Sequence, residues 1–297
     1  MRSSGNSGGR EREADRPQAA HEKRDGGRGP NLLYVIGIGP GGPDYICLRA
    51  HDVLQEVSAV AGYTTYIDLI QPLVAGKKII QTPMKKEVER VEAAIETALA
   101  GEPCAIVSSG DPGIYAMAGL VFEMCQKKGI PIRAPHADAP AEGDGALLIE
   151  VIPGIPALAA GASLLGAPLT HDFAAVSLSD LLTPWELIER RLDAAAAADF
   201  VIIIYNPRSK RRSDHLETAQ EIILRHRAPG TPVGIVTGAM RDNQRVRLTT
   251  LGDLHLAEVD MQTTVFVGNS GTFEYLGHMI TPRGYAAKYD LEEKTAG

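Results

Sequence analysis

The segment Ser109-Gly-Asp-Pro-Gly-Ile-Tyr115 holds the residues of this chain that are best suited to ligand chemistry. Its glycines expose backbone N–H groups, but Asp111 places a carboxylate among them, and a carboxylate repels phosphate. A ligand with positive charge and hydrogen-bond donors fits better, such as an amino-acid moiety, a ribose hydroxyl pair or a sulfonium. S-adenosylmethionine has all three. The alternative is an ordinary Asp-Pro-Gly turn in which Asp111 caps the next helix.

A second glycine-rich turn, Gly37-Ile-Gly-Pro-Gly-Gly42, follows an apolar run and satisfies the pattern GxGxxG. Two features argue against a nicotinamide cofactor. Pro40 and Pro43 remove N–H groups from the loop, and the next expected strand, 59–63, does not end in Asp or Glu for a ribose. No Lys-Ser/Thr pair follows Gly42, so a nucleoside triphosphate loop is not indicated either. A tight strand-to-helix turn without a ligand is the alternative.

Composition restricts the functional classes that fit this chain. Its 297 residues are long enough for two domains, and 44% hydrophobic with 5% aromatic content is typical of a soluble, aliphatic α/β protein. The net charge of −7 argues against nucleic acid or an anionic membrane and favours a small-molecule partner. Cys47, Cys104 and Cys125 form no CxxC pair, so we expect no disulfide framework, no metal site and a cytoplasmic location. No apolar run approaches the roughly 20 residues that span a membrane.

Alternating strand and helix patterns position the two glycine loops. We expect strands beginning at Leu32 and over 59–63, 77–81, 104–109, 130–133 and 147–152, with helices through 50–54 and over 87–100, 116–128 and 157–165. This alternation predicts a parallel, doubly wound sheet. Ligands bind at the carboxyl ends of the strands in such sheets, which is where both glycine loops would lie.

A second block of patterns predicts another sheet. Its expected strands are 173–177, 200–205, 232–237, 245–250 and 263–267, and its expected helices are 184–198 and 213–226. The last strands follow one another without a helix, so this sheet should be mixed. We therefore expect an N-terminal domain over 31–168, a C-terminal domain over 169–285 and a ligand cleft between them. Residues 1–30 and 286–297 are expected to be tails, the first of them disordered, and 135–145 an exposed loop.

Three motifs in this order and spacing resemble the tetrapyrrole methyltransferase family: Gly37-Ile-Gly-Pro-Gly41, Ser109-Gly-Asp-Pro-Gly-Ile-Tyr115 and Pro153-Gly-Ile-Pro-Ala157. Later segments are similar to the branch that methylates C17 of precorrin-3B in corrin synthesis, namely 166–173, 177–185, 205–209, 267–270 and 281–285. The resemblance implies two α/β domains with the ligand between them, S-adenosyl-L-methionine as methyl donor, a tetrapyrrole substrate and a homodimer.

The resemblance also implies which residues bind. By position, the cofactor residues are Pro40, Ser109, Gly110, Asp111, Ile114, Pro156, Ala157, Asn206, Ala239 and Thr264, with Tyr115 as a neighbour. The expected substrate residues are Gly39, Gly41, Asp44, Ser177, Ser179 and Arg208; Arg208 opens a basic run, 208–212, suited to carboxylates. Gly42 and Cys47 depart from the Asp and Thr that the family often has there, and 82–86 departs from the branch's glycine-rich turn.

Methyl transfer from a sulfonium requires alignment more than acid–base chemistry, and we expect no nucleophilic triad. The implied reaction also contracts the macrocycle, a step that moves protons. His171, Asp172 and Asp180 are the candidates for that role; the alternative is that His171 bonds backbone and Asp180 caps the helix near Pro184.

Three other functions stay open. The first is a methyltransferase of the same fold that acts at another tetrapyrrole position or on another substrate, such as ribosomal RNA or diphthine. The second is a catalytically silent ligand-binding member, and the third is a nicotinamide oxidoreductase. The sequence also leaves open whether the substrate carries cobalt.

Overall fold

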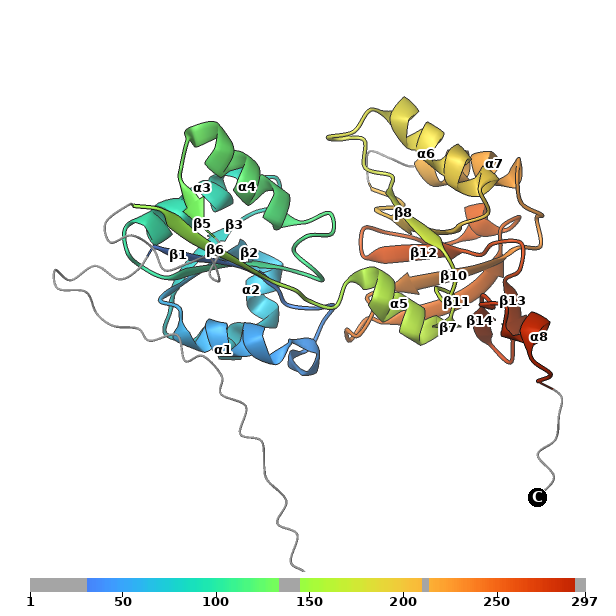
Figure 1. The fold of residues 1–297 in the computed structure, drawn as a ribbon, viewed down its shortest axis with the longest axis horizontal. Coiled ribbons are helices and arrows are strands. Elements are labelled where there is room, and N and C mark those ends of the chain that lie inside the picture. The colour runs from blue at the N-terminus through green and yellow to red at the C-terminus, as the bar shows by residue number, and fades with distance from the viewer. Residues whose placement is uncertain (1–30, 134–144, 210–213, 292–297) are drawn as a thin grey trace, which may run out of the picture.

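The structure is a computed structural model that describes residues 31–133, 145–209 and 214–291. The chain forms two sheets with helices on their faces, and β6 leads from the first sheet to helix α5 beside the second (Figure 1). The predictions for 1–30, for most of 135–145, for Lys210 to Arg212 and for 292–297 lie outside the described residues.

The first sheet has the strand order β3-β2-β4-β1-β6-β5, and every pair in it is parallel. Its strands are β1 (Leu32–Gly37), β2 (Ala59–Tyr63), β3 (Lys78–Thr82), β4 (Cys104–Ser108), β5 (Ile132–Arg133) and β6 (Leu147–Ile152). Its helices are η1 (Pro43–Tyr45), α1 (Leu48–Glu56), α2 (Thr64–Leu69), η2 (Gln71–Leu73), α3 (Glu87–Leu99) and α4 (Met117–Lys128). One apolar cluster joins the sheet to α3 and α4, and another joins its opposite face to α1 and α2. The predicted doubly wound parallel sheet is confirmed.

The strand order sets where a ligand can bind. Strand β1 lies between β4 and β6, so the chain leaves β1 in one direction along the sheet and returns on its other side. Such a reversal opens a crevice at the carboxyl ends of the strands. The three motifs that carry the family resemblance follow β1, β4 and β6, so the topology brings all three to this crevice.

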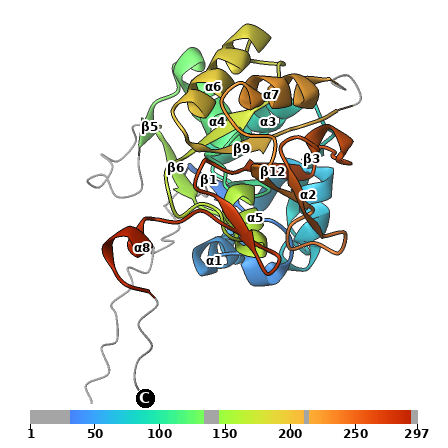
Figure 2. The same cartoon turned by 90° about the vertical axis from the view of Figure 1, so that its right-hand side faces the viewer.

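The second sheet is mixed, as predicted. Its order is β11-β10-β12-β9-β8, with only β8 and β9 parallel. The strands are β8 (Phe173–Ser177), β9 (Val201–Tyr205), β10 (Pro232–Thr237), β11 (Arg245–Thr250) and β12 (Thr263–Val267). Helices α6 (Trp185–Ala197) and α7 (His215–Leu224) and the turn η3 (Leu254–Leu256) cover one face, and α5 (Ala157–Leu165) covers the other (Figure 2).

Several short elements were not predicted. Strands β13 (Phe273–Tyr275), β14 (His278–Ile280) and β7 (Gly166–Ala167) form a third sheet, and α8 (Tyr285–Lys288) enters the expected C-terminal tail. Strands of two or three residues are too short to show a periodic pattern. Strand β7 also lies just before the expected domain boundary at 168. The division into domains stays a prediction, but the packing of α5 on β10 and β12 favours a boundary at 153–156, before this helix.

Candidate functional site

Three glycines from three different strand ends touch at the crevice. A Cβ on Gly37 would lie 2.5 Å from the Gly110 oxygen and 2.6 Å from the Gly154 nitrogen, and a Cβ on Gly154 would lie 2.2 Å from the same Gly110 oxygen. Gly39 and Gly110 also exchange backbone hydrogen bonds, with N to O distances of 3.2 and 2.8 Å. Only glycine permits this backbone contact, so the loops after β1, β4 and β6 form one packed unit.

The Asp111 carboxylate binds backbone on both sides of the crevice. Its Oδ1 accepts from the Gly113 N–H at 2.8 Å, and its Oδ2 accepts from the Gly154 N–H at 3.2 Å. Helix α4 begins only at Met117 and has no side-chain cap, so the alternative of Asp111 as a helix cap is wrong. Within the described residues Asp111 forms no ion pair, and a carboxylate can accept more than two hydrogen bonds. Asp111 therefore keeps both charge and acceptor sites for a ligand.

Arg241 joins the second sheet to these loops, and the sequence did not single it out. It lies in the turn after β10, where its Nε donates to the Pro40 oxygen and its Nη2 donates to Ser109 Oγ at 2.8 Å. A Cβ on Gly41 would lie 2.1 Å from the Met240 oxygen, so the two turns are in contact. Burial lowers the pKa of the Arg241 guanidinium. The available signal was weak, a charged residue four positions after an expected strand.

Two tyrosines extend the contact between the sheets. The Tyr115 hydroxyl donates to the Ala175 oxygen at 2.9 Å, and its ring lies 5.1 Å from the Tyr205 ring. The Tyr205 hydroxyl accepts from the Leu158 N–H at 2.9 Å, at the start of α5. Burial raises the pKa of Tyr205 to about 12 and also raises that of Tyr115, so both phenols are protonated at neutral pH.

The remaining predicted cofactor residues lie around this unit. Pro156 and Ala157 lie against Gly110, since a Cβ on that glycine would be 3.7 Å from the Pro156 Cα and 3.8 Å from the Ala157 nitrogen. Ile114 donates its N–H to the backbone carbonyl oxygen of Asp111, within the same turn. Ala239 packs in the apolar cluster that contains α5.

Asn206 and Thr264 lie on the second sheet. Asn206 has a φ of 52° and donates from Nδ2 to Ser177 Oγ at 2.9 Å. Thr264 is buried on the same face of β12 as Phe266, which meets α5. No hydrogen bond connects either of them to the glycine loops within the described residues.

The predicted substrate residues divide into two groups. Gly39 and Gly41 belong to the packed unit, and Ser177 and Ser179 lie at the carboxyl end of β8, where the Ser179 N–H donates to Ser177 Oγ. Asp44 and Arg208 are exposed, Asp44 in η1 and Arg208 after β9.

The three predicted catalytic residues are not together. His171 and Asp172 precede β8 and line a pocket with Asp199 and Ser270, whereas Asp180 follows the other end of that strand. The span from Asp172 to Ser177 is roughly 16 Å at about 3.3 Å a residue. His171 Nδ1 accepts from the Asp172 N–H at 2.8 Å, as the backbone alternative expected.

Asp180 lies 3.5 Å from His215 Nε2 rather than at the start of α6, which has no side-chain cap. The alternative that Asp180 caps this helix is therefore wrong. Asp180 lies at the same end of the second sheet as Ser177 and Asn206, and so on the side that meets the glycine loops.

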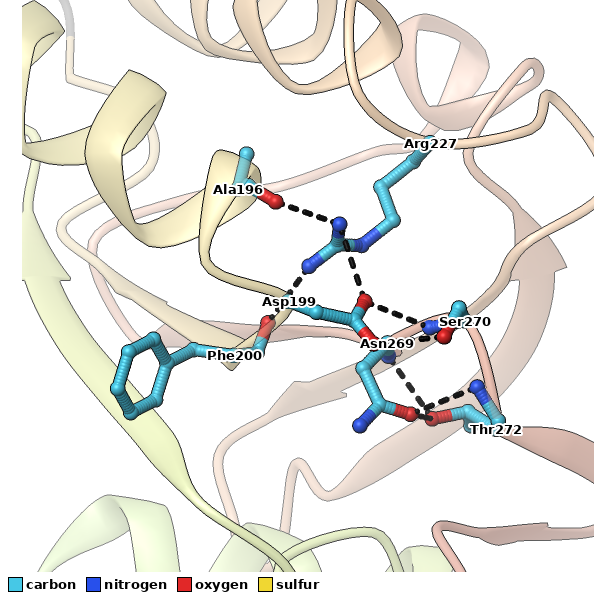
Figure 3. Close-up of polar contacts among 8 residues, drawn as sticks. Ala196, Asp199, Phe200, Arg227, Asn269, Ser270 and Thr272 are labelled. Carbon is cyan, nitrogen blue, oxygen red and sulfur yellow. Dashed lines mark hydrogen bonds and ion pairs between the residues drawn. The ribbon is translucent and has the colours of Figure 1, made fainter.

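A polar network borders the pocket at the far end of β8 and β9 (Figure 3). Its central residue is Arg227, whose Nε is buried and has no hydrogen-bond partner among the described residues. Arg227 donates to the Ala196 and Phe200 oxygens, and its Nη1 lies 3.1 Å from Asp199 Oδ1. Ser270 donates to Asp199 from both its N–H and its hydroxyl. Burial alone would raise the pKa of Asp199, but the Ser270 hydrogen bonds and the Arg227 charge outweigh it and hold that pKa below its usual range.

The described residues contain no helix long and apolar enough to cross a membrane, and no group of three or more His, Cys, Asp or Glu side chains that could hold a metal ion. The fold and the crevice define an α/β protein whose loop site suits a ligand with positive charge and hydroxyl groups. A second, mixed sheet covers that site.

Comparison with known proteins gives the family. Residues 32–255 match Tetrapyrrole (Corrin/Porphyrin) Methylases. The chain is 49% identical over 261 residues to a cobalt-factor III methyltransferase of Priestia megaterium. The matched region covers 88% of this chain but only 46% of that protein. It is 47% identical to a probable cobalt-factor III C(17)-methyltransferase of Salmonella typhimurium, covering 86% of this chain and 99% of the relative.

Among solved structures, the crystal structure of the methyltransferase CobJ is similar, with a TM-score of 0.75, 35% identity, and 84% of this chain and 99% of that chain covered. The chain belongs to the tetrapyrrole (corrin/porphyrin) methylase family, as predicted. The cofactor predicted for it is S-adenosyl-L-methionine, and one structure of similar fold, a uroporphyrin-III C-methyl transferase of Thermus thermophilus with 21% identity, is complexed with S-adenosyl homocysteine. The residues present fit this cofactor. The close glycine contacts bring the three loops together around Asp111. Within the described residues its carboxylate has no ion-pair partner, and it suits a ligand that carries an ammonium, a sulfonium and two hydroxyls.

Proposed function

We propose that this protein transfers a methyl group from S-adenosyl-L-methionine to C17 of cobalt-factor III or precorrin-3B, coupled to ring contraction, in cobalamin biosynthesis. The observation that carries the proposal is the packed unit of Gly37, Gly110 and Gly154, with the Asp111 carboxylate on it. The Salmonella relative, whose length is almost wholly covered, supports the C17 position. The chain covers only 46% of the Priestia relative, so the activity of that whole protein is a weaker guide to the activity of this one.

The chain's own residues contribute alignment. The cofactor supplies an electrophilic methyl group, and the acceptor carbon of an electron-rich tetrapyrrole is already nucleophilic. Holding two reactants in line can supply up to roughly 7–11 kcal/mol of the barrier. The glycine unit and the Tyr115 contact with the second sheet make the crevice rigid, which is what such alignment requires.

Ring contraction requires proton transfer, and Asp180 is the better candidate among the three predicted residues. Its position beside Ser177, on the side of the glycine loops, supports this role. The His215 imidazole, 3.5 Å from Asp180, can hold or exchange a proton with that carboxylate. His171 and Asp172 lie at the far end of β8 and are the weaker candidates.

We also infer a cytoplasmic homodimer. Large apolar side chains are exposed together on the third sheet and α8: Phe273, Tyr275, Leu276 and Tyr285. Exposed apolar groups of this size are typical of surfaces that another protein covers. Size-exclusion chromatography with light scattering tests the dimer, and a monomeric mass at micromolar concentration would contradict it.

The decisive experiment is a methyl-transfer assay under anaerobic conditions with cobalt-factor III and, separately, precorrin-3B. We expect one substrate to gain one methyl group by mass spectrometry, with a changed absorption spectrum once the ring contracts. D111A should abolish transfer, whereas D68A, which alters an exposed carboxylate on α2, should not. Binding of S-adenosylhomocysteine without turnover of either substrate would instead support the silent ligand-binding alternative. A product methylated at another position would support the other methyltransferase alternative.

A further inference from the structure

Arg241 is a cation without a carboxylate, placed where the two sheets meet. It has five N–H donors, of which two are used, one by the Pro40 oxygen and one by Ser109 Oγ. Both acceptors are neutral. Within the part of the chain that the structure describes, no acidic group pairs with Arg241. Its positive charge is therefore left without a counter-charge.

A second cation, Arg90, lies on the same side of the sheet as Arg241, because both guanidinium groups and the Glu87 carboxylate act on the half-buried Tyr66 phenol. Burial outweighs these charges and raises the pKa of that phenol. Arg90 is 3% exposed and donates to Thr82, Pro83 and the Met117 sulfur, so its donors are used inside the fold. Arg241 is only half-buried, and three of its N–H groups donate to no acceptor within the described residues.

Burial disfavours the charged form of a guanidinium group, so an unpaired and partly desolvated arginine costs free energy unless a ligand supplies a hydrogen-bond acceptor or an opposite charge. Guanidinium groups bind carboxylates in a two-pronged geometry that no other side chain reproduces. Asp111, two residues after the Ser109 that Arg241 holds, supplies the opposite charge to the same crevice. The pair suits a ligand with both a cationic group and a carboxylate.

We propose that Arg241 binds a carboxylate of the ligand in this crevice, while its other N–H groups fix the loops after β1 and β4. The inference rests on the proposed function. The carboxylate belongs either to the amino-acid end of the cofactor or to a side chain of the tetrapyrrole, and the test distinguishes these two sources. An arginine used only as a clamp between loops is the competing explanation.

The test compares three ligands on the full chain: S-adenosylhomocysteine, 5′-methylthioadenosine, which lacks the amino-acid carboxylate, and cobalt-factor III. The first two are titrated by calorimetry and the third by absorbance, on wild type, R241Q, R241K and the control R247Q, which changes an exposed arginine on β11. We expect R247Q to match wild type. In R241Q we expect a loss of about tenfold or more, restricted to a carboxylate ligand.

Loss of affinity for S-adenosylhomocysteine but not for 5′-methylthioadenosine assigns the cofactor carboxylate. Loss for cobalt-factor III alone assigns the substrate carboxylate. Unchanged affinity for all three ligands, or equal losses for the two nucleosides alone, would overturn the proposal in favour of a clamp. Should R241Q fail to fold, R241K is judged by the same ligand-selective loss.

The wild-type protein separates this inference from the proposed function on which it rests. If wild type binds neither S-adenosylhomocysteine nor cobalt-factor III, the proposed function fails and this inference fails with it. If wild type methylates its substrate, the proposed function holds and the Arg241 variants alone decide the inference.

Discussion

Arg241 and Arg227 are two arginines in similar physical settings with different consequences. Burial lowers the pKa of both guanidinium groups, and both donate to backbone oxygens. Arg227 also has a carboxylate, Asp199, 3.1 Å away, and Ser270 completes that pair from the other side. Among the residues that the structure describes, Arg241 donates only to the neutral Pro40 oxygen and Ser109 Oγ.

The difference shows how a fold can pair some charged side chains with each other and leave others for a ligand. The Asp199 network at the far end of β8 and β9 satisfies its charges internally, so a ligand would gain little there. The crevice at the end of β1, β4 and β6 keeps an unpaired carboxylate and an unpaired guanidinium on a rigid glycine frame. Unsatisfied charge held in place is what a ligand of complementary charge can use.

The largest effect should come from the glycine frame. In G154A the new Cβ would lie 2.2 Å from the Gly110 oxygen, a backbone atom that cannot move alone. We expect a loss of about 3 kcal/mol or more in the free energy of unfolding and no binding of S-adenosylhomocysteine. Urea unfolding and calorimetry measure both.

The matched control for this change is G42A, since no atom lies within 4 Å of its Cβ and its φ is −71°. It should unfold like wild type. Equal stability of G154A and G42A would show that the strand ends are not packed as described.

The next effect separates the two arginines. R227M removes a cation that is 5% exposed and leaves Asp199 without its ion-pair partner. We expect the free energy of unfolding to fall by about 2 kcal/mol. This is less than the loss of a fully buried ion pair would cost, because Asp199 is itself exposed. The folded protein should bind S-adenosylhomocysteine with unchanged affinity. R241Q should show the opposite pattern, with ligand affinity more affected than stability. A selective loss of ligand affinity in R227M would remove the contrast between the two regions.

A smaller effect should appear with pH. The pKa of Asp199 is held below its usual range in the folded protein, so its contribution to stability is complete above the unfolded-state pKa of about 3.9 and is lost as pH falls through the folded value. Wild type should thus be more stable than D199N at pH 7, and the gap should narrow towards pH 3. Urea midpoints measured at steps of pH test this, and a constant gap would argue that the carboxylate charge does not matter.

The smallest effect is expected at His171. Because this residue lies at the far end of β8, H171Q should leave the rate of methyl transfer within about threefold of wild type. D180N, at the end that meets the glycine loops, should slow product formation by tenfold or more if it moves protons in ring contraction. Single-turnover assays on both variants compare them, and the reverse order of effects would move the acid–base role to the pocket beside Asp199.

Much of the architecture was predictable because buried strands are apolar runs that end at glycine or proline. The expected limits of 147–152, 173–177 and 263–267 agree with β6, β8 and β12. Helix α5 agrees as well, since Pro156 precedes it and Gly166 follows it. The third sheet was missed because its strands have only two or three residues, and β7 pairs with β14, more than a hundred residues away.

The sequence by itself determined the two larger sheets, the family and the three loops that form the site, since residue type and spacing encode local backbone geometry and burial. The tertiary structure alone decided which charges are paired. Arg241 meets Ser109 across 132 residues, and no local feature distinguishes it from Arg227. It also decided that His171 and Asp180, nine residues apart, lie at opposite ends of β8, because an extended strand of five residues carries its flanking side chains far from each other.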